Sequence, residues 1–135
     1  MAAEDPEPLL DELRWKSRVL LIFSPEADDA RSTAFRQAVS DAACAMEARD
    51  LVLGQVTSGG DSFLASKQIS PASSAALRRK FGIAEETFRV LLIGKDGGVK
   101  ASYSKAPALA EVFALIDGMP MRRQEMREQA EPCVE

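Results

Sequence analysis

The feature that most constrains this chain is a pair of short, strictly apolar runs, each bounded by residues that end a strand. The first runs from Val19 to Phe23 and precedes Ser24 and Pro25; the second runs from Val90 to Ile93 and precedes a glycine. Both are far shorter than the roughly 18 residues of a membrane span. They predict strands buried on both faces, and therefore a sheet with helices on both sides.

Strand and helix patterns alternate around these two runs. The sequence predicts strands over 18–24, 51–57, 88–94 and 99–103, and helices over 27–49, 71–81, 107–117 and 121–129. The first two strands and the helix between them form a crossover unit, whose strands should be parallel. The Asp96-Gly97-Gly98 segment between two strand patterns indicates an antiparallel hairpin. Residues 58–70 have no periodicity, so we expect a surface loop there.

The 135 residues suffice for one domain with a hydrophobic core. We divide the chain into an acidic N-terminal lead (1–17), a central domain (18–117) and a C-terminal helix and tail (118–135). We expect Trp15 to cover one edge of the core. The residues expected to be buried are Leu21, Phe23, Phe35, Val90, Leu92, Phe113 and Ile116.

The order of elements is that of the thioredoxin fold, an α/β fold with a mixed four-stranded sheet and helices on both faces. Four segments, 18–25, 28–31, 90–100 and 119–126, also resemble an uncharacterised bacterial thioredoxin-like family of unknown function. That family is similar to the P-DUDES domains of secreted equarin and sushi-repeat proteins. The resemblance implies a thioredoxin-like fold and often export from the cytoplasm, and it implies no settled activity.

The residue types exclude several kinds of catalysis. Because the chain has no His, it cannot form a Ser-His-Asp or Cys-His pair, and two Cys are too few for a zinc site of His and Cys. Thioredoxins carry a Cys-x-x-Cys pair between the first strand and the first helix. Here residues 24–29 contain no thiol. Cys44 lies roughly five turns along the expected helix, where we expect a small buried side chain; a disulfide with Cys133 stays open.

The sequence therefore predicts a non-enzymatic binding or interaction module that needs no cofactor or metal. The alternative is a peroxiredoxin-like or partner-assisted thiol oxidoreductase, which would depend on Cys44 or Cys133. Asp28, Asp29 and Arg31 are the candidate ligand-binding residues, because they cluster at the start of the first helix.

The C-terminal segment supplies the candidate partner-binding residues, which are Arg122, Arg123 and Met126. Flexible Met side chains beside Arg suit an adaptable docking surface. The structural interpretation, which we favour, is that Met119, Met121 and Met126 pack on the domain. Arg122 and Arg123 would then face outward or pair with acidic neighbours.

Charge and the N-terminal composition limit partners and location. A net charge of −4 argues against nucleic acid as the main partner, which leaves a protein or a small molecule. Residues 61–105 hold eight basic and four acidic side chains, expected to form a solvated face that includes Arg78 and Lys95. The Ala-rich start is what signal-peptide removal would leave. It predicts a periplasmic or secreted protein, with a cytoplasmic one as the alternative.

Overall fold

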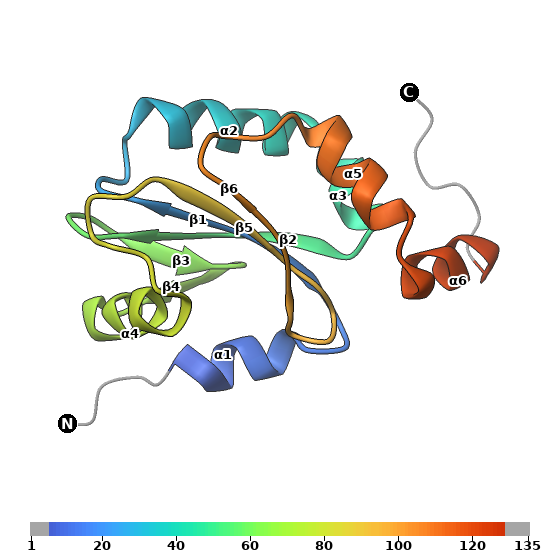
Figure 1. Ribbon diagram of the computed structural model, residues 1–135, viewed down its shortest axis with the longest axis horizontal. Helices are drawn as coiled ribbons and strands as arrows, with labels where there is room; N and C mark the ends of the chain where they lie inside the picture. The colour runs from blue at the N-terminus through green and yellow to red at the C-terminus, as the bar shows by residue number, and fades with distance from the viewer. Residues whose placement is uncertain (1–5, 129–135) are drawn as a thin grey trace.

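The computed structural model describes residues 6–128, with side chains from Leu10 onward, and it is built on one six-stranded sheet (Figure 1). The strands are β1 (Arg18–Ser24), β2 (Leu51–Thr57), β3 (Ser62–Leu64), β4 (Lys67–Ile69), β5 (Arg89–Ile93) and β6 (Val99–Tyr103). The helices are α1 (Pro6–Leu13), α2 (Ala30–Asp41), α3 (Ala43–Ala48), α4 (Pro71–Phe81), α5 (Leu109–Asp117) and α6 (Pro120–Glu128). No helix in the described range is long and apolar enough to cross a membrane.

The sheet is mixed, as predicted, and its strand order is β4-β3-β2-β1-β5-β6. β1 and β2 are parallel and joined by α2 and α3, whereas the other neighbouring pairs are antiparallel. The expected number of four strands was too low, because β3 and β4 form a short hairpin inside the segment predicted to be a loop. Strands of three residues are too short to show a periodic pattern, and β3 is held by its pairing with β2.

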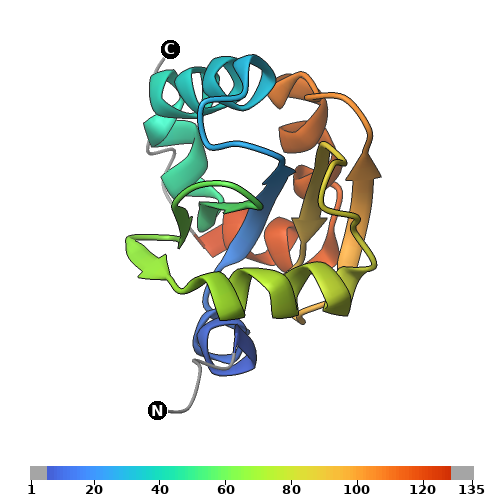
Figure 2. The same cartoon turned by 90° about the vertical axis from the view of Figure 1, so that its left-hand side faces the viewer.

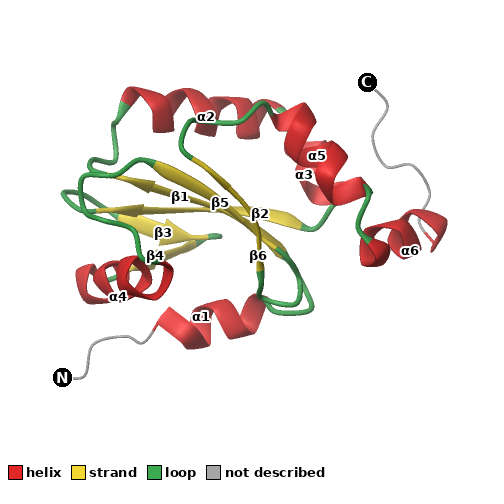
Figure 3. Ribbon diagram, in the orientation of Figure 1, coloured by secondary structure: helices red, strands yellow, loops and turns green. Residues whose placement is uncertain are grey.

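Two helical layers cover the sheet, with α2, α3 and α5 on one face and α1 and α4 on the other (Figures 2 and 3). Alternate residues of β1 supply the two cores: Leu20 and Ile22 face the first layer, and Val19, Leu21 and Phe23 face the second. Of the residues expected in the core, all are buried except Phe113, which is half-buried. The prediction that the central strands are covered on both faces is thus confirmed.

Helix ends follow local chemistry where a cap is present. Ser70 caps α4, and Gly82 ends it in the left-handed conformation at φ 69°, both as predicted. The helix expected over 27–49 begins later, at Ala30, and is interrupted at Ala42. No Gly or Pro lies near Ala42, so the residue types there did not indicate the break.

The N-terminal segment differs from the expectation at Trp15, whose side chain is 62% exposed and covers no edge of the core. Instead Leu10 and Leu13 of α1 pack against the second core cluster. α1 also contacts α4. The division of the chain at residues 17 and 117 stays a prediction.

Candidate functional site

The turn between β1 and α2 carries an ion pair where thioredoxins carry thiols. Asp29 caps α2 by accepting from the backbone N–H of Arg31 at 2.9 Å. The Arg31 guanidinium returns to the same carboxylate, with Nε 3.0 Å from Oδ1 and Nη2 2.7 Å from Oδ2. It also lies 4.5 Å from the centre of the Phe88 ring. The Arg31 hydrogen bond lowers the pKa of Asp29, and the pair neutralises itself.

Of the three predicted ligand-binding residues, the structure therefore joins Asp29 and Arg31 and leaves Asp28 apart. The Asp28 side chain is exposed and forms no hydrogen bond or ion pair with a described residue. Ligand binding by these three residues stays a prediction.

A buried polar network lies under the same turn. Ser24 Oγ donates to the carbonyl of Glu26 at 2.8 Å and accepts from Nε2 of Gln55 at 3.0 Å. Nη1 of Arg36 donates to Oε1 of Gln55 at 2.6 Å and to the carbonyl of Ala27 at 3.1 Å. No base accepts the Ser24 proton, so this hydroxyl is not an activated nucleophile. The network holds the turn in place.

Arg78 of α4 reaches across the carboxyl ends of the two parallel strands. Its Nη2 donates to the carbonyls of Ser24, at 2.7 Å, and Val56, at 3.3 Å, while Nη1 donates to that of Ala84 at 2.8 Å. The side chain is buried and forms no ion pair with a described carboxylate. Burial lowers the pKa of Arg78. The solvated basic face expected over 61–105 is thus wrong for Arg78, and also for Lys95, which is buried.

A cavity of about 270 Å³ lies beside Arg78, between α4 and the loop that follows β2. Its lining includes Thr57, Ser58, Ser74 and Glu85. Two buried polar atoms of this lining, Oγ of Ser74 and Nε of Arg78, have no hydrogen-bond partner among the described residues.

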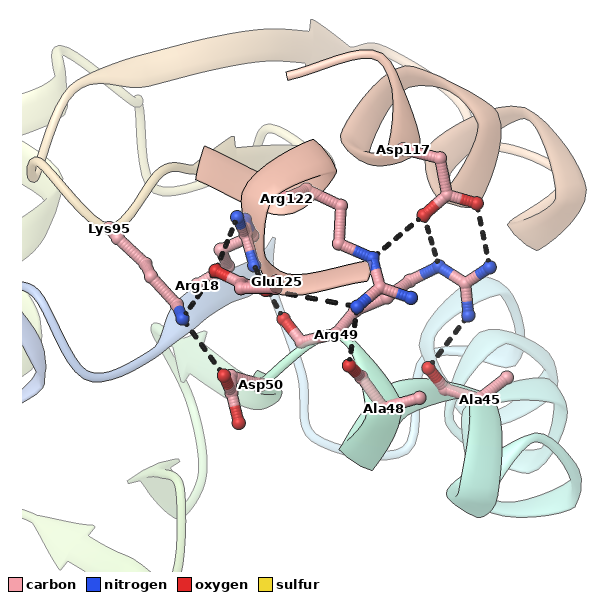
Figure 4. Close-up of polar contacts among 9 residues, drawn as sticks. All are labelled: Arg18, Ala45, Ala48, Arg49, Asp50, Lys95, Asp117, Arg122 and Glu125. Carbon is pink, nitrogen blue, oxygen red and sulfur yellow. Dashed lines mark hydrogen bonds and ion pairs between the residues drawn. The ribbon is translucent and has the colours of Figure 1, made fainter. Parts of the chain in front are cut away.

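A second polar centre, which we call the α6 ion cluster, ties the last helix to the end of the sheet (Figure 4). Its charged members are Arg18, Arg49, Asp50, Lys95, Asp117, Arg122 and Glu125. Glu125 accepts from Nη1 and Nη2 of Arg18 at 3.1 and 3.2 Å and from Nζ of Lys95 at 2.7 Å. Burial acts to raise the pKa of Glu125, but the hydrogen bonds from Arg18 and Lys95 outweigh it, and the pKa is lowered.

Asp117 is the second acidic centre of the α6 ion cluster. Arg49 donates to both of its oxygens, at 3.1 and 2.9 Å, and Nε of Arg122 donates at 3.0 Å. Nη1 of Arg122 also donates to the carbonyl of Ala48 at 2.8 Å. Burial acts to raise the pKa of Asp117, and the two arginines reverse this and lower it. The cluster is a structural clamp, because its charges pair with one another.

These contacts decide where the predicted partner-binding residues lie. Arg122 is buried and pairs with acidic neighbours, as expected, and Arg123 is exposed. Met119 packs against the core, but Met121 and Met126 are exposed, so the expected packing of the Met side chains is wrong for those two. Ion pairs hold α6 instead.

Sequence reasoning did not single out Arg18, Arg49 or Glu125 as members of a site. The one available signal was a charged residue, Arg18, at the first position of a fully buried strand. Its carboxylate partner is 107 positions away in the chain, so no local pattern connects the two.

Cys44 differs from the expectation of a small buried side chain. Cys44 is exposed on α3 and is disulfide-bonded. The described part of the chain holds no free cysteine thiol, and Cys133 lies outside the described residues.

Solved structures with a similar course of the chain are peroxiredoxins. The reduced 2-Cys peroxiredoxin of Plasmodium vivax superposes with a TM-score of 0.61 at 17% identity, covering 89% of this chain and 85% of that one. Thioredoxin peroxidase I of Plasmodium yoelii superposes with a TM-score of 0.60 at 20% identity, covering 92% of this chain and 83% of that one. At such identities the likeness shows the fold, and it confirms the thioredoxin-like fold predicted from the sequence.

Sequence relatives are found in larger animal proteins. Coiled-coil domain-containing protein 80 of Danio rerio is 30% identical over 136 residues, covering 89% of this chain and 16% of that protein. The human Sushi repeat-containing protein SRPX is 27% identical over 126 residues, covering 91% and 27%. The chain therefore spans about a sixth to a quarter of the length of these relatives. Residues 9–125 match the family described as Domain of unknown function (DUF4174), and the chain belongs to that family.

Proposed function

We propose that this chain is a thioredoxin-fold binding module that acts without a redox dithiol. The supporting observation is the β1–α2 turn, where the Asp29–Arg31 ion pair stands beside Phe88 and no thiol is present. Thiol chemistry in this fold depends on a thiolate stabilised at a helix N-terminus. Glu26, Asp28 and Asp29 place negative charge in this turn, and negative charge would destabilise a thiolate there.

The alternative, a peroxiredoxin-like or partner-assisted thiol oxidoreductase, would have to use Cys44 or Cys133. Cys44 lies on α3, beyond the whole of α2, and its sulfur is in a disulfide. A reductant would have to open that bond before Cys44 could attack a peroxide. The likeness to peroxiredoxins concerns the course of the chain at 17–20% identity, so it supplies no argument for their chemistry.

Two assays test the proposal directly. The full chain and its Cys44→Ser variant are compared for peroxide consumption and for insulin reduction, each with dithiothreitol or a thioredoxin system as electron donor. We expect both proteins to match the blank without protein. Turnover by the full chain that disappears in Cys44→Ser would overturn the binding-module proposal and establish the thiol oxidoreductase.

A further inference from the structure

We propose that the cavity beside Arg78 binds a small amino carboxylate, with the ligand carboxylate held by Arg78 and Ser74. This inference rests on the proposed binding function and names its ligand class. Arg78 brings a buried positive charge to the lining of the cavity. Arg78 is 5% exposed, donates to three backbone carbonyls and lies over the Phe23 ring. Glu85 attracts its charge, but no described carboxylate forms an ion pair with it. A buried cation without an ion-pair partner in contact is unfavourable, and an anionic ligand would supply that partner.

Two polar atoms of the lining have no hydrogen-bond partner in the described chain. The three carbonyls account for Nη1 and Nη2 of Arg78, so a purely structural role would explain those two nitrogens. It does not explain Nε of Arg78 or Oγ of Ser74, which are buried without a partner in the described chain. Buried polar groups are nearly always bonded. Both residues line the same cavity. Nε of Arg78 can only donate and Oγ of Ser74 can donate or accept, so an acceptor such as a carboxylate oxygen would satisfy both.

The cavity lies at the carboxyl ends of the two parallel strands. Ser24 and Thr57 end the parallel strands β1 and β2, and Arg78 and Thr57 bring the cavity to those ends. Ligands of open α/β sheets bind outside the carboxyl ends of such strands. The hydroxyls of Thr57 and Ser58 already donate to the carbonyls of Asp61 and Glu85. Among the hydroxyl groups that line the cavity, that of Ser74 is therefore the one that donates to no acceptor in the described chain.

The charge of Glu85 discriminates among anionic ligands. Glu85 also lines the cavity, and its carboxylate opposes a doubly charged phosphate while it favours an ammonium group. A ligand with a carboxylate for Arg78 and an amino group for Glu85 satisfies both. The volume of about 270 Å³ lies just below the usual range for ligand pockets, so the ligand is small.

The experiment is an NMR titration of the ¹⁵N-labelled full chain at constant ionic strength. The probes are glycine, β-alanine, acetate and inorganic phosphate, and the reporters are the backbone amides of Gly60, Ser74 and Arg78. We expect saturable shifts with glycine or β-alanine, weaker ones with acetate and the weakest with phosphate. No saturable shift with the amino carboxylates, or tighter binding of phosphate, overturns the inference.

Variants assign the binding to named atoms. Because Oγ of Ser74 has no partner in the described chain, Ser74→Ala should keep the thermal midpoint and weaken binding about tenfold, the effect of one lost hydrogen bond to a charged group. Ser104→Ala removes an exposed hydroxyl and serves as the matched control. Equal affinity in Ser74→Ala and Ser104→Ala would contradict the assignment.

The charged groups have their own pair of tests. Arg78→Gln should abolish binding, and Arg79→Gln, which removes the exposed neighbouring charge, should leave it intact. If Arg78→Gln does not fold, Glu85→Gln decides instead, because the Glu85 side chain is exposed: the preference for amino carboxylates over acetate should disappear. A preference that persists in Glu85→Gln overturns the inference. Failure here with no thiol-dependent turnover removes only this ligand assignment, whereas thiol-dependent turnover removes the proposed function.

Discussion

Glu125→Gln is the substitution that most directly tests how the last helix is held. Glu125 is the carboxylate shared by Arg18 and Lys95, whose side chains are 1% and 8% exposed. Glutamine keeps the shape of the side chain and one acceptor oxygen, but it removes the negative charge. The remaining oxygen can accept from Arg18 or Lys95 but carries no charge, so the charged partner of Arg18 is lost and its hydrogen bond to the carbonyl of Arg49 stays, while Lys95 keeps Asp50. Buried Arg18 is thus left without an ion pair in the described chain, and buried Lys95 loses one of its two.

The magnitude follows from burial. Removing one partner of a buried ion pair destabilises a protein by about 3–5 kcal/mol. Glu125 is 14% exposed, and glutamine retains one acceptor, so we expect a loss at or below the lower end of that range, about 2–3 kcal/mol. In a domain of this size each kcal/mol shifts the Tm by about 4 °C, which gives a decrease of about 8–12 °C.

The assay is thermal and urea unfolding of the full chain followed by circular dichroism. Glu128→Gln is the matched control: it removes the same charge from the same helix, but Glu128 is exposed and accepts from Gln124. We expect the control to change the free energy of unfolding by less than about 0.5 kcal/mol. If Glu125→Gln falls within the range of this control, the α6 ion cluster does not stabilise the fold and the reasoning is refuted.

Two further predictions concern stability. Leu92 is fully buried in the first core cluster, so Leu92→Ala should lower the free energy of unfolding in urea by about 2–5 kcal/mol; a loss below about 1 kcal/mol would mean that Leu92 is not central. The folded pKa values of Glu125 and Asp117 are lowered, so their stabilisation is complete above the ordinary carboxyl pKa and is lost as the pH falls through the folded values. Urea midpoints measured from pH 7 downward should decrease below about pH 4.5, and the decrease should be smaller in Glu125→Gln; an identical profile for the two proteins would contradict this assignment.

The sequence by itself determined the elements that depend on local chemistry. The apolar runs of β1 and β5 predict buried strands because neither face of these runs carries a polar side chain that water could hydrate. Ser70 and Gly82 mark the ends of α4 because capping and a left-handed backbone are properties of single residues. The missing dithiol is also a matter of residue types, since residues 24–29 contain no sulfur.

Only the tertiary structure decided which charges are buried. Arg18, Arg78 and Lys95 are residue types usually found in water, and apart from the place of Arg18 at the start of a buried strand, no local pattern indicates that they are buried. Their partners lie far away: Glu125 is 107 positions from Arg18 and 30 from Lys95, and the carbonyl of Ser24 is 54 from Arg78. The pairing of β3 with β2 likewise depends on contacts across the sheet. Hydrophobic periodicity depends only on the order of residues in the chain. A buried charge, in contrast, is compensated only once the fold has brought it and its partner together.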